Sequence, residues 1–473
     1  MQIAYYIDNQ RTDMRIQYLI ELEESMDKKN ISSLIERRAQ EFIDLAEKIW
    51  ERPEVALEEV YASSLQMEYL AANGFRVRNV NGLSTAFTAE FGNGKPVIGL
   101  LGEYDALPGL SQKVTAQREP IAADDPGHGC GHNLIGVGCI AAAIAIKELI
   151  EKGILNGTIK YFGCPAEERF GGKRLMLNAN AFDGVDCCFS WHPESVNKIT
   201  KETFRAIYDV SYRFRGTTSY IAADREMGGN AVSAMELLNI GVQYLRAHLN
   251  DDYIIEYCVT KGAETSNVLP EITEISYALR ADNTDQCKKL VERIGKIAEG
   301  AALMSGTTVK PEITGEYYSE LYNEVLGDIV YRNMVEVPRP EYTPEEIEFA
   351  DTLAETIGKF PVDRTKSYYG IVETQGSMHR GVAKQDRISY KPASDVGNVS
   401  WQIPTAMFFV ATNPIGMPMH TWQATATSGS SLGYKGMFYA SKVMAASIFE
   451  LMEHPEKVEA AKKAFNENFA DRK

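Results

Sequence analysis

Between about residues 95 and 194, apolar runs typical of strands alternate with segments typical of helices. The run KPVIGLLGEYDAL is continuously apolar through VIGLL, as in a strand buried at the centre of a sheet. It is followed by the Ala-rich helical segment LIGVGCIAAAIAIKELIEKG, the strand TIKYFGCPAEE, the helix GKRLMLNANAFDG and the strand VDCCFSWHPE. This alternation predicts an α/β domain, in which ligands normally bind beyond the carboxyl ends of the strands.

A second, α+β unit is predicted for residues 204–316, where the pattern of the sequence changes. Its expected strands are RAIYDVSYRFRG, YIIEYCVT, ITEISYALRA and TTVKPEIT, and its expected helices are AVSAMELLNIGVQYLRAHL and DQCKKLVERIGKIAEGAALMSG. This order indicates a four-stranded sheet covered by two helices. The unit is inserted into the first domain, which then consists of residues 1–203 and 317–473 and holds a mixed sheet between helices.

Helical spacing of apolar residues predicts further helix over 34–75, broken near Pro53, and over 433–452. The charged tail after residue 452 is expected to be the end of that last helix. The stretch from 336 to 391 is rich in Pro and charge, and no element is predicted for it.

The charge balance limits the classes of partner. Acidic residues outnumber basic ones by 65 to 49, and the formal charge of −16 repels nucleic acid and anionic membranes. No apolar run of about 18 residues is found, and acids are dispersed through the first thirty residues where a signal peptide has an apolar core. We therefore expect a cytoplasmic protein whose site supplies local positive charge if its substrate is an anion.

The seven cysteines are odd in number and lack the spacing of a disulfide framework. Most are expected to be small buried hydrophobic residues. Cys130 is the exception, because it lies two residues before His132 in the Gly-rich motif HGCGHN.

Five side chains with metal-binding chemistry lie in short segments after strands or apolar runs. They are Cys130, His132, Glu168 of PAEE, His192 of SWHPE and His420 of PMHTW. Each alone is most often structural or solvated, but thiolate, imidazole and carboxylate together are the donors that zinc and manganese bind. One ion needs three or four of these donors, so five with a bridging member indicate two ions.

The neighbouring acid Glu167 has a different predicted role. If Glu168 faces an ion, Glu167 lies on the other side of the extended chain and can reach a water without being a ligand. A divalent ion lowers the pKa of such a water, and a carboxylate can pass its proton to a leaving nitrogen. This favours amide hydrolysis over phosphoester cleavage, whose sites rarely contain a thiolate.

The motifs HGCGHN, CPAEE, SWHPE and MHTW, with an α+β unit between the last two, resemble the metallo-aminoacylase and carboxypeptidase family. Within it, GEYDALPGLSQ, GHGCGHNLIG, SDVGNVSW and HTWQ are similar to the aminobenzoyl-glutamate hydrolase branch, and the likeness covers the chain after about residue 35. It implies a two-metal peptidase-like domain with an inserted lid and dimerisation domain. It also implies hydrolysis of an N-acyl or dipeptide-like substrate, such as an aroyl-glutamate, with two ions of Zn or Mn, or Co.

The resemblance assigns roles to individual residues. Cys130 bridges the two ions, the other four donors complete the ligand set, and Glu167 is the general base. Asp105 orients a ligand imidazole. A more distant branch has a metal-binding histidine at the position of Glu103. In this chain His132 then takes over the coordination role of that histidine. Three residues match substrate-binding positions of the family. Asn267 and Arg280 match residues that bind the α-carboxylate of the substrate, and Gly416 matches a glycine that lets the backbone approach the substrate closely.

One position departs from the family pattern. Relatives carry a histidine that crosses a dimer interface to stabilise the oxyanion, and this chain has Tyr220 there. A phenol can donate one hydrogen bond to an oxyanion. Three alternatives follow: an active homodimeric amidohydrolase, a weakly active subunit that needs a related partner chain, and a metal-dependent binding protein, against which the presence of Glu167 argues.

Overall fold

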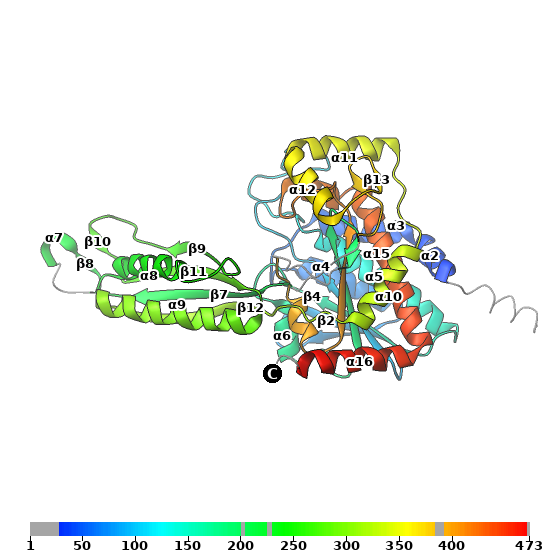
Figure 1. Cartoon of the computed structure of the whole chain (residues 1–473), viewed down its shortest axis with the longest axis horizontal. Helices are drawn as coiled ribbons and strands as arrows, with labels where there is room; N and C mark the ends of the chain where they lie inside the picture. Colours follow the sequence, from blue (N-terminus) through cyan, green and yellow to red (C-terminus); the bar gives the residue numbers. More distant parts are fainter. Residues whose placement is uncertain (1–27, 200–203, 225–228, 384–391, 471–473) are drawn as a thin grey trace, which may run out of the picture.

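The computed structural model describes residues 28–199, 204–224, 229–383 and 392–470. It consists of a rounded body from which an elongated arm projects (Figure 1). The prediction made for the first thirty residues falls almost entirely outside these ranges.

A mixed seven-stranded sheet forms the centre of the body. Its strand order is β1-β2-β4-β3-β5-β15-β6. The strands are β1 (Arg76–Val80), β2 (Leu83–Asn93), β4 (Gly157–Cys164), β3 (Val97–Glu103), β5 (Cys187–Glu194), β15 (Thr405–Ala411) and β6 (Lys198–Ile199). The four strands β3, β4, β5 and β15 run parallel to one another, and the outer strands pair antiparallel with them or with each other. The expected mixed sheet between helices is confirmed.

Helices cover both faces of this sheet, because successive strand residues point to opposite sides. Leu100 belongs to a large core with α2 (Lys28–Glu36), α3 (Ala39–Glu51), α4 (Val60–Ala72), α5 (His132–Glu151), α10 (Glu324–Glu336), α15 (Ser431–Glu453) and α16 (Pro455–Ala470). Its neighbour Leu101 faces a smaller core with α6 (Gly172–Asn178) and α13 (Val396–Ser400).

Helix α5 is the central helix of the larger core. By length and composition it is apolar enough to cross a membrane, which the count of apolar residues in the sequence did not predict. However, 83% of its apolar window is buried inside the protein. It packs against α15, α3 and β3, as the core helix of a globular protein does.

The arm contains the predicted four-stranded sheet with two helices. Its strand order is β12-β7-β11-β9, and every neighbouring pair is antiparallel. The elements are β7 (Ala206–Arg215), α8 (Ala231–Arg246), β9 (Ile254–Lys261), β11 (Ile272–Ala281), α9 (Thr284–Ser305) and β12 (Thr308–Tyr317). A separate hydrophobic core joins the sheet to α8 and α9. The division into domains at residues 203/204 and 316/317 stays a prediction.

The stretch for which no element was predicted contains two helices, α11 (Pro344–Ile357) and α12 (Lys359–Tyr369), and the short strands β13 (Thr374–Gln375) and β14 (Met378–His379). Helix α11 begins with a capping box between Thr343 and Glu346, with Pro344 in its first turn. These residues satisfy backbone N–H groups at the helix start, so the charged sequence folds as helix. The tail is a separate helix, α16, rather than the end of α15.

Candidate metal centre

The carboxyl ends of the parallel strands meet at one edge of the central sheet, and the predicted site residues lie there. Asp105 follows β3, Glu167 and Glu168 follow β4, His192 is near the end of β5, and His420 lies in the segment after β15. Cys130 and His132 reach the same edge from the start of α5.

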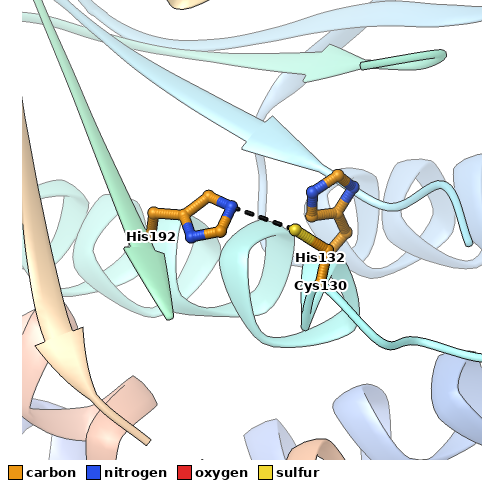
Figure 2. Close-up of side chains that lie close together, drawn as sticks. All are labelled: Cys130, His132 and His192. Carbon is orange, nitrogen blue, oxygen red and sulfur yellow. Dashed lines mark hydrogen bonds between the residues drawn. The ribbon is translucent and has the colours of Figure 1, made fainter. Parts of the chain in front are cut away.

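Gly131 presents Cys130 and His132 to a common centre. It caps the start of α5 with a left-handed backbone (φ 74°), which favours glycine. A Cβ atom here would lie 2.8 Å from Cγ of Pro193, so a larger residue is also excluded by space. Figure 2 shows the result: Sγ of Cys130 lies 3.3 Å from Nε2 of His192, with the His132 ring beside them.

Asp105 fixes the orientation of His132. Oδ1 of Asp105 lies 2.7 Å from Nδ1 of His132, and its Oδ2 accepts a hydrogen bond of 2.9 Å from the backbone N–H of Glu168. Because Nδ1 is engaged, Nε2 of His132 is the atom that faces the centre. Asp105 thus contacts a ring that was predicted to be a ligand, and its orienting role stays a prediction.

Glu168 and His420 form a second close pair. Nε2 of His420 lies 3.4 Å from Oε2 of Glu168. The backbone N–H of His420 donates to the carbonyl of Gly129 at 2.9 Å, which ties the two loops together. His420 itself has a left-handed backbone (φ 60°), an uncommon conformation for a residue other than glycine.

Among the described residues, three sets of side chains have donor atoms within 4.8 Å of one another. The sets are Cys130 with His132 and His192, Cys130 with Glu168 and His420, and Glu103 with His132 and Glu167. Cys130 is common to two sets, as a bridging ligand must be. Buried atoms without a hydrogen-bond partner include Nε2 of His132, Oε1 of Glu168 and Oε2 of Glu103. Such atoms are costly unless they bind something, so the donors fit divalent metal ions.

The electrostatics of the centre shift the pKa values of two neighbouring glutamates, Glu167 and Glu168, in opposite directions. Burial raises the pKa of Glu167 well above its usual range, and the nearby carboxyl groups of Glu103, Asp395 and Glu168 raise it further. Burial also acts upward on Glu168, but its hydrogen bond to His420 and the nearby rings lower its pKa to about 2. Glu168 is thus suited to remain an anion, whereas Glu167 is suited to carry a proton.

Cys130 is favoured as a thiolate. Burial and Glu168 act to raise its pKa, but the rings of His192 and His132 lower it to about 6. A thiolate is the form that binds metal and the form expected of a bridging ligand.

A pocket of about 660 Å³ opens over these donors. Its walls come from the body and from the base of the arm. The predicted site residues in its lining are Cys130, Glu167, Glu168, His192, Arg280 and His420. The pocket also contains Asp209, Glu256, Tyr317 and Phe409, which were not predicted as site residues. Asp209 and Glu256 reach the site from the arm, and no local sequence signal marks such a residue.

Arg280 and Asn267, both predicted to bind the substrate carboxylate, do not converge within one chain. Arg280 lines the pocket, with Nε 3.5 Å from Oε2 of Glu256. Asn267 is exposed and precedes β10 (Val268–Leu269), whose label lies at the far end of the arm (Figure 1). Asn267 precedes β11, whereas Arg280 lies near the other end of this strand, and the eight steps from Ile272 to Arg280 span roughly 26 Å at 3.3 Å per residue.

Tyr220 also lies at the far end of the arm. It is in β8 (Ser219–Tyr220), pairs with Val268 of β10, and is 49% exposed. It is not among the residues that line the pocket of its own chain. Neither Tyr220 nor Asn267 therefore lies at the metal centre of its own chain in this structure.

Gly416 packs against the body rather than lining the pocket. Its backbone is left-handed (φ 81°), and a Cβ atom would lie 2.7 Å from the backbone of Pro361 in α12. The close approach in the structure is thus to α12, and the predicted contact with substrate stays a prediction.

Comparisons with known proteins agree with this geometry. The model of peptidase family M20/M25/M40 matches residues 99–428. The chain is 36% identical to one of the subunits of the p-aminobenzoyl-glutamate hydrolase of Escherichia coli, covering 89% of this chain and 91% of that protein. It is 27% identical to mouse Xaa-Arg dipeptidase, covering 91% and 92%. A dinuclear metal-binding peptidase of the M20 family from Bacillus subtilis has a similar fold (TM-score 0.57, 18% identity, 88% and 99% covered).

Proposed function

The chain belongs to peptidase family M20/M25/M40, and on this premise we propose that it hydrolyses the amide bond of an N-acyl amino acid at a centre of two divalent metal ions. One observation carries the proposal: five donors from four separate segments converge, four of them in the lining of one pocket and the fifth, His132, grouped with Cys130 and His192. Beside them lies the carboxyl group of Glu167, which belongs to neither Cys130-containing set.

The residues divide into two ligand sets that share Cys130. His132 and His192 would hold one ion with it, and Glu168 and His420 would hold the other. The mixture of sulfur, nitrogen and oxygen donors suits Zn or Mn, with Co as a third candidate. When bound, such ions activate water and polarise the carbonyl of the scissile amide.

Glu167 is proposed as the acid–base group. Its ionised carboxylate takes a proton from the attacking water, and the resulting carboxyl group delivers that proton to the leaving nitrogen. The hydroxyl of Tyr317 donates to the backbone carbonyl of Glu167 at 3.1 Å, which holds this residue at the pocket wall. The raised pKa of Glu167 favours its protonated form, from which the proton is delivered to the leaving nitrogen.

Arg280 is proposed to bind the free α-carboxylate of the substrate. Among the described residues that line the pocket, Arg280 is the one with a guanidinium group. Five acidic residues line the same pocket: Glu167, Glu168, Glu194, Asp209 and Glu256. In a protein of charge −16, a local cation of this kind is needed to attract an anion. Together with the similarity to a p-aminobenzoyl-glutamate hydrolase subunit, this favours an aroyl-glutamate or related N-acyl amino acid.

A homodimer joined through the arms is proposed to complete the site. Tyr220 and Asn267 lie far from the metal centre of their own chain, so they contribute to hydrolysis only from a second subunit. The exposed apolar residues of the arm agree with an interface: Tyr220, Ile240, Tyr244, Tyr257, Val259 and Val268 are each at least 41% exposed.

A second candidate function is a subunit of a hetero-oligomer with little activity alone. The observation that favours it is Tyr220, which offers a weaker oxyanion donor than the histidine of relatives. The similar Escherichia coli protein is itself named as a subunit. In this alternative, a related chain supplies the missing donor.

The test is hydrolysis by the purified chain. The metal-free protein is reconstituted with Zn, Mn or Co and assayed on p-aminobenzoyl-glutamate and a panel of other N-acyl amino acids and dipeptides. We expect metal-dependent release of the free amino acid. Turnover only after a related subunit is added selects the second candidate. A metal-loaded chain without turnover in either setting would contradict both.

A further inference from the structure

A buried lysine lies beneath the metal centre and joins two carboxylates. Nζ of Lys173 in α6 lies 2.5 Å from Oε1 of Glu103, at the end of β3, and 2.5 Å from Oδ1 of Asp395, at the start of α13. The backbone N–H of Lys173 donates to Oδ2 of Asp395 at 2.8 Å. All three side chains are at most 1% exposed. The triad therefore has a fixed geometry and no contact with solvent.

The triad leaves one buried oxygen unpaired. Both oxygens of Asp395 accept hydrogen bonds from Lys173, and Oε1 of Glu103 is paired as well. Oε2 of Glu103 has no hydrogen-bond partner. Two carboxylates around one ammonium also carry a net negative charge, which is costly in a dry interior unless another cation is near.

The unpaired oxygen faces the metal centre. Oε2 of Glu103 lies 3.4 Å from Nε2 of His132, the atom that Asp105 leaves available for a ligand bond. Glu103 also forms a metal-capable set with His132 and Glu167. We propose that Glu103 is a further ligand of the metal centre, whose Oε2 binds the same ion as Nε2 of His132. This inference rests on the proposed two-metal function.

Lys173 and Asp395 act as positioning residues in this proposal. Lys173 holds Oε1 of Glu103, so that rotation of the carboxylate away from the centre breaks a buried ion pair. Asp395 holds Lys173 through two hydrogen bonds. The added oxygen raises the number of protein donors around the His132 ion beyond the sulfur and two imidazoles of the first set. Higher coordination with more oxygen favours Mn over the four-coordinate geometry typical of structural Zn.

Metal affinity tests the proposal without reference to turnover. The full-length protein is freed of metal with a chelator and titrated with Mn²⁺ in a calorimeter, and the cobalt form is examined by visible absorption. Glu103→Gln keeps the side-chain volume and an oxygen for Lys173 but removes the anionic donor. We expect one of the two ions to bind at least about tenfold more weakly, with an altered cobalt spectrum and the other ion unchanged.

Glu320→Gln is the matched control. Glu320 is also 1% exposed, and its Oε2 also has no hydrogen-bond partner, but it belongs to none of the metal-capable sets among the described residues. We expect its affinities and cobalt spectrum to equal those of the wild type. If both variants weaken binding equally, the effect comes from a buried charge in general and the proposal is overturned.

The remaining outcomes are distinct. A wild-type chain that binds no ion refutes the proposed function, and this inference with it. A wild-type chain with two ions, and a folded Glu103→Gln variant with the same affinities and cobalt spectrum, refute only the inference. If circular dichroism shows that Glu103→Gln does not fold, Glu103→Asp is titrated instead. This change withdraws the carboxylate by one methylene, so we expect weaker binding, and unchanged binding overturns the proposal.

Discussion

The carboxylate of Asp105 lies 2.7 Å from Nδ1 of His132, and both side chains are fully buried. Its second oxygen accepts a hydrogen bond from the backbone N–H of Glu168. One side chain thus contacts both a proposed ligand from α5 and the loop that carries a proposed ligand after β4. The relationship predicts that Asp105 controls metal affinity although it belongs to none of the metal-capable sets among the described residues.

Asp105→Ala is expected to weaken metal binding by about 10- to 100-fold, because the His132 ring and the Glu168 loop both lose their anchor. Asp105→Asn keeps an oxygen for Nδ1 of His132 but places an amide N–H against the N–H of Glu168, so its loss is expected to be intermediate. Calorimetric titration of the metal-free proteins measures both. Wild-type affinity in Asp105→Ala would mean that His132 is held in place by packing alone.

Glu167→Gln is expected to leave the metal content unchanged and to lower turnover by roughly a hundredfold or more, because the amide cannot accept the proton of the attacking water. Elemental analysis and steady-state kinetics on the same preparation separate the two effects. Loss of metal together with turnover would instead make Glu167 a ligand. Retained turnover would assign the acid–base role to another group.

The strands and helices with strong periodic patterns were predictable from the sequence. In β11, alternating burial over Ile272–Ala281 matches the predicted strand, because the apolar residues of ITEISYALRA recur at every second position. The edge strand β1 was missed because RVRNV is short, charged and largely exposed. Helix α11 was missed although Thr343, Pro344 and Glu346 form a recognisable start signal, since charge and Pro in the wider stretch obscured it.

The site was predictable in part for a physical reason. Short motifs after parallel strands must meet at one edge of the sheet, so the convergence of Cys130, His192 and His420 followed from their order. The ion pairs of Lys173 could not be predicted, because its partners lie 70 and 222 residues away in the sequence. The separation of Asn267 from Arg280 is set by the length and direction of β11, which no local motif encodes.

Arg280→Ala is expected to raise KM and to lower kcat/KM for substrates with a free α-carboxylate, because the guanidinium pairs with that group. The fall in kcat/KM should correspond to a loss of roughly 2 to 3 kcal/mol of transition-state stabilisation. An amidated analogue should lose much less. Arg213→Ala is the control, since Arg213 is also on the arm sheet but is 56% exposed and pairs with Glu274. Equal losses for the acid and amide substrates would show that Arg280 is structural.

Glu320 predicts a specific dependence of stability on pH. Burial raises its pKa to about 8, from 4.5 in an exposed carboxyl group. Between pH 4.5 and 8 the unfolded chain therefore releases the proton of Glu320 while the folded chain retains it, so the contribution of this group to stability falls as the pH rises through that window. Below pH 4.5 both states are protonated and the penalty is absent.

Glu320→Gln removes this penalty. At roughly 1.4 kcal/mol per pKa unit, we expect its free energy of unfolding to exceed that of the wild type by up to roughly 4 kcal/mol at pH 8 and by about 1 kcal/mol or less near pH 5. Urea unfolding at both values measures the difference. Glu312→Gln, at an exposed position, is the control. A Glu320→Gln variant no more stable than the wild type at pH 8 would mean that the carboxylate has a compensating partner.

Tyr220 is the residue on which the mechanism and the assembly depend together. It lies at the far end of the arm, is 49% exposed, and is absent from the pocket lining of its own chain. If its hydroxyl stabilises the oxyanion in a second subunit, Tyr220→Phe should lower kcat by roughly tenfold to a thousandfold. The phenyl ring keeps the interface packing, so light scattering should still show a dimer.

The competing explanation is that Tyr220 only packs at the interface, where tyrosine is common. Unchanged kcat in a dimeric Tyr220→Phe variant would support it. Mixing subunits resolves the remaining ambiguity: a Glu167→Gln chain keeps its Tyr220, and a Tyr220→Phe chain keeps its Glu167. If Tyr220 acts across the interface, a heterodimer of these two inactive chains contains one complete site, so mixing them should restore up to about half of the wild-type activity per heterodimer. A mixture that stays inactive although heterodimers form would show that Tyr220 does not act across the interface, and that the loss of activity in Tyr220→Phe has another cause.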